Sequence, residues 1–409
     1  MHPAVLPLDD VLVFDLSRVL SGPYCSMYLG DFGARVVKLE RPGEGDDTRS
    51  YGPPFVAGEA CYYLSVNRNK QSMALDLKHP EGRALAHAIA ARADVVLENF
   101  RPGTLDRLGL GPRALMAQNP RLIYASISGF GHHGDPAWSS RPGYDLVVQG
   151  LGGIPSITGP EPGPPSKVGT SVADMVAGLY ALIGILVALH ARTRTGRGQH
   201  VDVSMLDGQV SLLTYHAASF LMAGEPARRL GNAHPSVAPY ETFQASDGWI
   251  NIAVGNDSLW RTFVRTVLAR PELADDPRYA SNAARVERRA ELIGWLGPLV
   301  RAESSAHWLA ALEAAGIPCG PILDVGQALA HPAVRARDMV TEILHPTAGP
   351  LRMTGVPVRL SDTPGSVRSA PPLLGEHSAE LLAELCGIDA ARFAELEAAG
   401  VVARARKPA

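Results

Sequence analysis

The sequence predicts an α/β protein built around a parallel sheet, because short apolar runs alternate with helix-like stretches along its first third. Runs that read as strands cover 11–17, 34–40, 94–100 and 121–131, and a helical pattern occupies 84–93. Strands that are apolar along their whole length are typical of parallel sheets covered by helices on both faces. At 409 residues the chain is longer than one core usually supports, so we expect two lobes.

The residues that end each predicted strand are the first candidates for ligand contacts, because open α/β sheets bind ligands at the carboxyl ends of their strands. They are Ser17 and Arg18, Glu40 and Arg41, Asn99 and Phe100, and Ser128 and Gly129. The sequence has no GxGxxG fingerprint after the first strand and no P-loop. This pattern argues against a dinucleotide site.

The middle of the chain indicates where the lobes divide. Residues 132–170 are rich in Gly, Pro and Ser, and a long irregular segment inside a compact domain is usually functional, so we expect it to form a wall of the site. A helix is predicted at 172–192 and a strand at 200–206. Residues 225–331 combine a strand-turn-strand pattern with helical segments, which predicts a smaller α+β lobe.

Composition excludes several classes of function. With 38 Lys and Arg against 41 Asp and Glu, the net charge is −3, so no general basic surface is available for nucleic acid or an anionic membrane. The four cysteines are scattered without metal or redox spacing, which indicates reduced thiols. The apolar run at 175–189 is shorter than the about 20 residues of a membrane span. We find no signal-peptide pattern and expect a cytoplasmic protein.

Asp174 is the most informative acidic residue, because it opens the long apolar helix three residues after Ser171. Ser-x-x-Asp before an apolar run is the pattern of a capping box, in which both side chains only satisfy backbone amides. The alternative is a nucleophile. The positive end of a helix favours an ionised carboxylate, and nearby amides can hold a developing oxyanion. The residues alone leave both interpretations open.

Ordered motifs along nearly the whole chain resemble the family III CoA-transferases. They include DLSRVLSGP (15–23), DFGARVVKLERPGEGDDTR (31–49), NRNKQSMALDLKHPEG (67–82), DVVLENFRPGTLDRLG (94–109), SVADMVAGLYALIGILVALHARTRTGRGQHVDVSM (171–205) and LGEHSAE (374–380). The resemblance implies a Rossmann-like large lobe of residues 1–222, completed by 340–409, and a smaller inserted lobe of 225–331. It also implies an interlocked homodimer.

The resemblance implies that Asp174 is the nucleophile. Its carboxylate would attack an acyl-CoA to give an acyl-aspartyl anhydride, and the CoA thiolate would then form a thioester on the same side chain. Such covalent catalysis keeps the thioester's activation energy without a metal or a tightly bound cofactor. Coenzyme A and its acyl esters are substrates in this scheme. The alternative to an enzyme is a protein that binds CoA esters without catalysing a reaction.

The same resemblance assigns residues to CoA. Arg41 would meet the adenine end, and Lys78 and Arg107 the phosphates. The remaining adenine or pantetheine contacts would come from Arg18, Val19, Leu75, Asn99 and Phe100. Any one of these cations taken alone is more often a solvated surface charge. Their convergence on strand ends of one sheet favours a binding site.

Three further positions concern the acid substrate. Leu20 and Arg18 differ from the glutamine and histidine of formyl-CoA transferase, which argues against formate and oxalate. Tyr144 stands where the related α-methylacyl-CoA racemases have a histidine, so racemisation is the less favoured alternative. The segment 230–243 has a single glycine, as in the branch that uses succinyl-CoA and small dicarboxylic acids. His234, with Arg228 or Arg229, would meet a second carboxylate.

Overall fold

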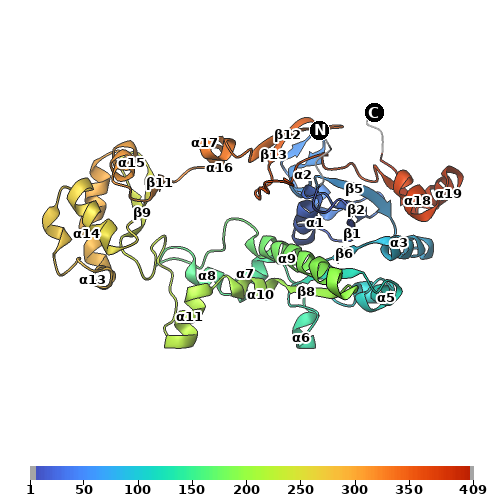
Figure 1. The fold of residues 1–409 in the computed structure, drawn as a ribbon, viewed down its shortest axis with the longest axis horizontal. Coiled ribbons are helices and arrows are strands. Elements are labelled where there is room, and N and C mark those ends of the chain that lie inside the picture. Colours follow the sequence, from blue (N-terminus) through green and yellow to red (C-terminus); the bar gives the residue numbers. More distant parts are fainter. Residues whose placement is uncertain (1–5, 406–409) are drawn as a thin grey trace. The chain divides into compact units, whose positions relative to one another are not determined.

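The computed structural model describes residues 6–405, and its main element is a seven-stranded sheet (Figure 1). The strand order is β14 (Val402–Ala403), β5 (Lys70–Leu75), β2 (Arg35–Glu40), β1 (Leu12–Asp15), β6 (Val95–Glu98), β7 (Ile123–Ser128) and β8 (His200–Ser204). Every neighbouring pair is parallel except β14 with β5. The parallel α/β fold predicted from the apolar runs is confirmed.

Helices pack on both faces of this sheet. One face is covered by α3 (Pro80–Arg92), α5 (Pro112–Gln118), α18 (Ser378–Cys386) and α19 (Ala390–Ala398), and the other by α1 (Ser21–Asp31), α7 (Asp145–Leu151), α9 (Val172–Thr195) and α10 (Met205–Ser211). Successive residues of a strand point to opposite faces of the sheet. Val95 therefore packs with the helices of the α9 face, and Val96 packs with the helices of the α3 face. This explains why the strands are apolar throughout.

Shorter elements complete the same part of the chain. They are η1 (Asp47–Ser50), β3 (Phe55–Val56), β4 (Glu59–Ala60), α2 (Cys61–Val66), α4 (Thr104–Arg107), α6 (Pro136–Ser139), α17 (Pro332–Arg335), β12 (Val340–His345) and β13 (Gly349–Thr354). The end of the chain returns to the sheet, where Val402 pairs with Leu75. Residues far apart in sequence therefore build one sheet.

Contacts divide the chain into two compact units. The first contains residues up to 154, 168–217 and 332 onward, and the second contains 155–167 and 218–331. Two of the four boundaries fall within helices, namely α8 (Ile154–Ile157) and α11 (Thr214–Ala223). In the second unit, an antiparallel sheet of β11 (Cys319–Pro321), β10 (Trp249–Ala253) and β9 (Tyr240–Gln244) accompanies α12 (Asp257–Thr262), η2 (Phe263–Val267), η3 (Pro271–Ala274), α13 (Asn282–Glu287), α14 (Arg289–Ala302), α15 (Ser305–Ala314) and α16 (Val325–Ala330).

Helix α9 is 24 residues long and is long and apolar enough to cross a membrane. About a third of its apolar stretch (33%) is buried in the chain. The buried residues, such as Ala177 and Ala181, are small and pack on the sheet, whereas Ile183 and Val187 are exposed. A helix was predicted here, and the structure shows a helix with one buried face and one exposed apolar face.

Candidate active site

Asp174 is the third residue of α9, and its carboxylate does not serve as a cap for the helix. Ser171 occupies the N-cap position without a side-chain cap hydrogen bond. Asp145, the first residue of α7, takes over that role: its Oδ1 accepts hydrogen bonds from the amides of Ala173 at 2.9 Å and Asp174 at 3.4 Å. The capping-box interpretation of Ser171 and Asp174 is therefore wrong.

The Asp174 side chain lies instead in a cavity of about 170 Å³ at the carboxyl edge of the main sheet. The cavity is lined by the ends of β1, β6 and β7, the starts of α1, α9 and α10, and the loop before α7. Its residues are Arg18, Val19, Ser21, Asp47, Tyr51, Asn99, Phe100, Arg101, Pro102, Ile127, Ser128, Gly129, Arg141, Pro142, Gly143, Tyr144, Asp174 and Met205. All of them belong to the first unit.

The Pro-rich segment is fixed to the sheet by two glycines. A Cβ placed on Gly143 would lie 2.3 Å from the Gly129 Cα, and one on Gly129 would lie 2.6 Å from the Gly143 Cα. Any larger residue at either position would push the two backbones apart. This close approach puts Arg141 and Tyr144 at the cavity beside the end of β7. Part of the segment expected to form a wall of the site lines this cavity.

The pKa of Asp174 is raised to about 7. Burial is the main cause, and the nearby Asp145 carboxylate raises the pKa further, while a hydrogen bond from Ser21 lowers it. Desolvation and the like charge thus act against the stabilisation of the ionised form that the helix start is expected to give.

A second cavity of about 210 Å³ adjoins the first, since Arg18 and Phe100 line both. The Arg18 guanidinium carbon lies 5.0 Å from the centre of the Phe100 ring. Five leucines form the apolar part of this second cavity, and Arg41 and Lys78 are among its polar residues. Its lining residues are Leu16, Arg18, Leu39, Glu40, Arg41, Gly45, Asp46, Leu75, Asp76, Leu77, Lys78, Phe100, Thr104 and Leu108.

Most of the residues predicted for CoA thus line one of two adjoining cavities. Arg107 lies beside the second cavity, where it donates to the Thr104 hydroxyl at 3.3 Å. Leu20 packs instead against Met27, Tyr28 and Val66. His234 belongs to the second unit, where its Nδ1 accepts from the Ser236 amide at 3.1 Å.

Buried charges hold the loop between the two cavities. Lys38 is 0% exposed and donates to the Ser17 carbonyl at 3.0 Å and to Asp46 Oδ2 at 2.8 Å. Asp46 Oδ1 in turn accepts from the Val19 amide at 3.2 Å. Val19 has φ 66, which is unfavourable for a β-branched residue. Such strained positions persist where surrounding contacts impose them, and they cluster at functional sites.

Among the residues of the site that sequence reasoning missed are Ser21, Asp47, Tyr51, Arg101, Arg141 and Asp145. Asp145 directly follows Tyr144 and lies inside the segment 132–170, which was predicted to be irregular, so its position did not indicate a role in capping another helix. Ser21 was read only as part of a family motif. The packing of segments that are far apart in the sequence brings these residues together, so no local sequence pattern indicates their place in the site.

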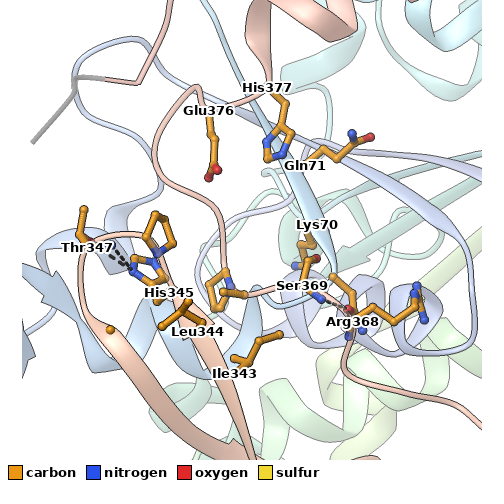
Figure 2. A pocket seen from close by; sticks show the side chains of 15 residues that line it. Lys70, Gln71, Ile343, Leu344, His345, Thr347, Arg368, Ser369, Glu376 and His377 are labelled. Carbon is orange, nitrogen blue, oxygen red and sulfur yellow. Dashed lines mark hydrogen bonds between the residues drawn. The ribbon is translucent and has the colours of Figure 1, made fainter.

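A larger hollow lies elsewhere, at the start of β5 and the β12–β13 hairpin, and has a volume of about 810 Å³ (Figure 2). It is lined by Lys70, Gln71, His345, Arg368, Glu376 and His377, among others, and Asp174 does not line it. Size alone is therefore a poor guide to this protein's chemistry. Within residues 6–405, no group of three or more His, Cys, Asp or Glu side chains is placed to hold a metal ion.

The fold and the first cavity define a parallel α/β protein that presents a carboxylate among arginines at the ligand-binding edge of its sheet. Residues 8–378 match the family described as CoA-transferase family III. The chain is 42% identical over 398 residues to human succinyl-CoA:glutarate CoA-transferase, covering 97% of this chain and 90% of that protein. It is 43% identical to acetyl-CoA:oxalate CoA-transferase of Acetobacter aceti, covering 94% and 97% respectively.

Solved structures agree with these sequence matches. A CaiB/BaiF family protein from Brucella suis superimposes with a TM-score of 0.82 at 43% sequence identity, covering 93% of this chain and 99% of that one. The chain therefore belongs to CoA-transferase family III and is a CoA-transferase. The family predicted from the ordered motifs is confirmed.

Proposed function

We propose that this enzyme transfers coenzyme A from succinyl-CoA to a small dicarboxylic acid, with Asp174 as the nucleophile. The observation that carries the proposal is the carboxylate of Asp174 in an open cavity while Asp145 satisfies the amides of the helix start. A carboxylate that caps no helix is available for attack. The name of the human relative, a succinyl-CoA:glutarate CoA-transferase, supports both the donor and a small dicarboxylic acid as acceptor.

In the proposed reaction, the ionised Asp174 attacks the thioester carbonyl of the donor. The C–S bond breaks, which leaves an acyl-aspartyl anhydride and CoA thiolate. The thiolate attacks the aspartyl carbonyl and expels the donor acid as its carboxylate, so CoA is now a thioester of Asp174. The acceptor carboxylate then attacks this thioester, and the same steps in reverse yield the new CoA ester and free Asp174.

The two cavities suggest which part of the CoA molecule binds in each. We assign its nucleotide end to the second cavity, where leucines would pack on the adenine and Arg41 and Lys78 would meet phosphates. The pantetheine arm would pass Arg18 and Phe100, which both cavities share, and reach Asp174. Binding energy from the remote nucleotide would thus position the thioester at the reacting carboxylate.

Replacing Arg41 or Lys78 with alanine is expected to raise the KM for acyl-CoA by about 3- to 10-fold each, with kcat nearly unchanged. Both side chains are exposed, so each charge contributes only about 1 kcal/mol to binding. Steady-state kinetics with a saturating acceptor acid measures this. Arg113→Ala, an exposed arginine of α5 outside both cavities, is the matched control. An unchanged KM in both variants would show that the nucleotide of CoA binds elsewhere.

The acceptor's second carboxylate would meet arginines of the first cavity. Arg101 and Arg141 both line it, and within the described chain the Arg101 guanidinium has no hydrogen-bond or ion-pair partner. Arg141 Nε donates to the Ala137 carbonyl at 3.1 Å, and its guanidinium lies 4.0 Å from the centre of the Trp138 ring. A stacked guanidinium is oriented in advance for a carboxylate. These residues are an alternative to His234 for this role.

Arg141→Ala is expected to raise the KM for glutarate or succinate by about 10- to 100-fold, the range for losing a charge-assisted hydrogen bond. A monocarboxylic acid of similar length should be affected much less, since it has no second charge. The measurement is the ratio of kcat/KM for glutarate to that for pentanoate in both proteins. A ratio that stays the same in Arg141→Ala would exclude this arginine from acceptor recognition.

The function itself is tested by incubating the protein with succinyl-CoA and a panel of acids, namely oxalate, glutarate, mesaconate and acetate, and identifying new CoA esters by mass spectrometry. We expect esters of dicarboxylic acids to dominate. A racemase would instead interconvert (R)- and (S)-2-methylacyl-CoA. Among the described residues that line the first cavity there is no histidine to act as the partner base, which disfavours that activity.

We also propose that the enzyme works as a cytoplasmic homodimer. The support for a second copy is the exposed apolar face of α9, where Leu179, Ile183 and Val187 are 39%, 53% and 60% exposed. Light scattering of the purified protein after gel filtration should give twice the mass of the chain. A monomer at micromolar concentration would contradict the proposal.

A further inference from the structure

Ser21 is a buried residue of the first cavity to which the proposed reaction has so far given no role. It is the first residue of α1 and is 3% exposed. It lines the cavity together with Asp174. The hydroxyl of a serine in such a place is a potential hydrogen-bond donor to whatever forms on the Asp174 side chain.

Packing of α1 on α9 fixes Ser21 beside Asp174. Gly178 follows Asp174 by one helical turn, so both residues lie on the same face of α9. A Cβ on Gly178 would lie 2.5 Å from the Ser21 carbonyl oxygen. The absent side chain therefore lets the start of α1 approach this face of α9 directly. The approach depends on backbone atoms, so it does not vary with side-chain rotamers.

Asn99 orients the Ser21 hydroxyl. One hydrogen of the Asn99 amide goes to the Arg18 carbonyl at 2.7 Å, and the other goes to Ser21 Oγ at 3.3 Å. Asn99 Oδ1 accepts from the Arg18 amide at 2.8 Å, which fixes the orientation of the whole amide group. Ser21 Oγ thus accepts from Asn99, which leaves its own hydrogen available for the Asp174 side chain on the same cavity wall; a contribution from this hydroxyl lowers the pKa of Asp174.

The proposed function creates negative charge at this position twice in each catalytic cycle. When CoA thiolate attacks the aspartyl carbonyl of the anhydride, its electron pair forms the C–S bond and the C=O pair moves onto the aspartyl oxygen. The tetrahedral intermediate collapses when that pair returns and the carboxylate of the donor acid leaves. The same oxyanion forms when the acceptor acid attacks the aspartyl thioester.

We propose that the Ser21 hydroxyl is a catalytic hydrogen-bond donor that stabilises the oxyanion formed on the Asp174 side chain. A donor that is already oriented gains strength as charge develops on its acceptor, so it lowers the barrier more than it stabilises the ground state. Asn99 positions this donor through its bond to Ser21 Oγ. The inference rests on the proposed function, because it needs an aspartyl acyl group.

The test compares Ser21→Ala with the parent enzyme over the pH range from about 6 to 9, with succinyl-CoA and the best acceptor of the panel. At about pH 9, where Asp174 is ionised in both proteins, we expect kcat to be about 100-fold lower in Ser21→Ala. The KM for succinyl-CoA should change by less than about 3-fold. Ser21→Thr, which keeps the hydroxyl, should recover most of the loss.

The pH dependence separates the oxyanion role from simple assistance to ionisation. If Ser21 only helped Asp174 to ionise, the defect of Ser21→Ala would disappear at about pH 9, and this result would overturn the inference. So would full activity of Ser21→Ala at every pH. If the parent enzyme itself forms no CoA ester with any acid, the proposed function fails instead, and the two failures are thus distinguishable.

Ser26→Ala is the matched structural control. Ser26 lies on the same helix, is 0% exposed and donates its hydroxyl to the Asp15 carboxylate at 2.5 Å, outside the cavity. It should lower thermal stability about as much as Ser21→Ala but keep kcat at about pH 9. An equal loss of kcat in both variants would assign the effect to packing and overturn the inference. Ser21→Cys, of similar size with a weaker donor, replaces Ser21→Ala if that variant does not fold.

Discussion

Replacing Asp174 with asparagine is expected to lower kcat for CoA transfer by at least about 10,000-fold, because an amide side chain cannot form the anhydride and the thioester. Asparagine keeps the size of the side chain, so the cavity and α9 should be unchanged. Thermal stability at neutral or higher pH should be equal or greater, since the fold no longer holds a partly buried carboxylate whose pKa is raised. Loss of activity without loss of stability is the signature of a nucleophile.

Two measurements check this prediction. Product formation is followed by mass spectrometry of CoA esters, and the intact protein is analysed after mixing with succinyl-CoA, where the parent enzyme should carry a hydroxylamine-sensitive CoA adduct on the peptide that contains Asp174. Asp174→Asn should carry none. Turnover by Asp174→Asn above about 1% of the parent rate would remove Asp174 as the nucleophile.

Asp207→Asn is the matched control for this substitution. Ser204 and Asp207 repeat the Ser-x-x-Asp spacing of Ser171 and Asp174 at the start of another helix, α10. There the serine does cap, since Ser204 Oγ accepts from the Asp207 amide at 3.1 Å, and Asp207 is exposed. We expect near-parent activity from Asp207→Asn, which would show that the loss in Asp174→Asn does not follow from any change to a helix start.

Activity is expected to fall about tenfold for each pH unit below about 7, because only the ionised form of Asp174 attacks. The sign follows from the pKa: below it the carboxyl is protonated and the rate is low, and above it the rate reaches a plateau. At about pH 5 the kcat/KM for succinyl-CoA should thus be about 100-fold below the plateau. A profile that is flat between about pH 5 and 8 would contradict a raised pKa for the nucleophile.

The variant Asp145→Asn tests whether the fall of activity at low pH, the acid limb of the profile, reflects protonation of Asp174. Removing the neighbouring negative charge lowers the pKa of Asp174, so the limb should move to lower pH while the plateau stays similar. The asparagine oxygen can still accept from the Ala173 amide, so the start of α9 should keep its cap. Both proteins are assayed with the same substrate, because CoA phosphates titrate equally in both. A limb that does not move would assign the titration to another group.

Much of the fold was predictable because its causes are local. The runs that form β1, β2, β6 and β7 have apolar residues on both faces. This pattern is expected of strands in a sheet that helices cover on both sides. Strand β5 was not predicted, since Lys70, Gln71 and Ser72 make its start polar. The structure explains this polarity: Lys70 is buried at 2% exposure, where it donates to the Pro23 carbonyl at 2.9 Å and the Asn67 side chain at 3.0 Å.

The candidate site was predictable to the extent that its residues end strands. Arg18, Asn99 and Phe100 line the first cavity because parallel strands all end at one edge of the sheet. Ser21, Arg141 and Asp145 reach the same place through loops and helix packing that involve contacts between distant segments. No spacing rule in the sequence relates them to Asp174, so sequence reasoning could not find them.

By itself, the sequence determined that this chain is an α/β CoA-transferase whose candidate nucleophile is Asp174. The pattern of strands and the ordered family motifs can both be read directly from the order of the residues. The Ser-x-x-Asp spacing taken alone left open whether Asp174 only belongs to a capping box with Ser171. Only the tertiary structure excluded the capping box. It places Asp145 on the amides at the start of α9, and so leaves Asp174 in a cavity, partly desolvated, with a pKa of about 7 and Ser21 beside it.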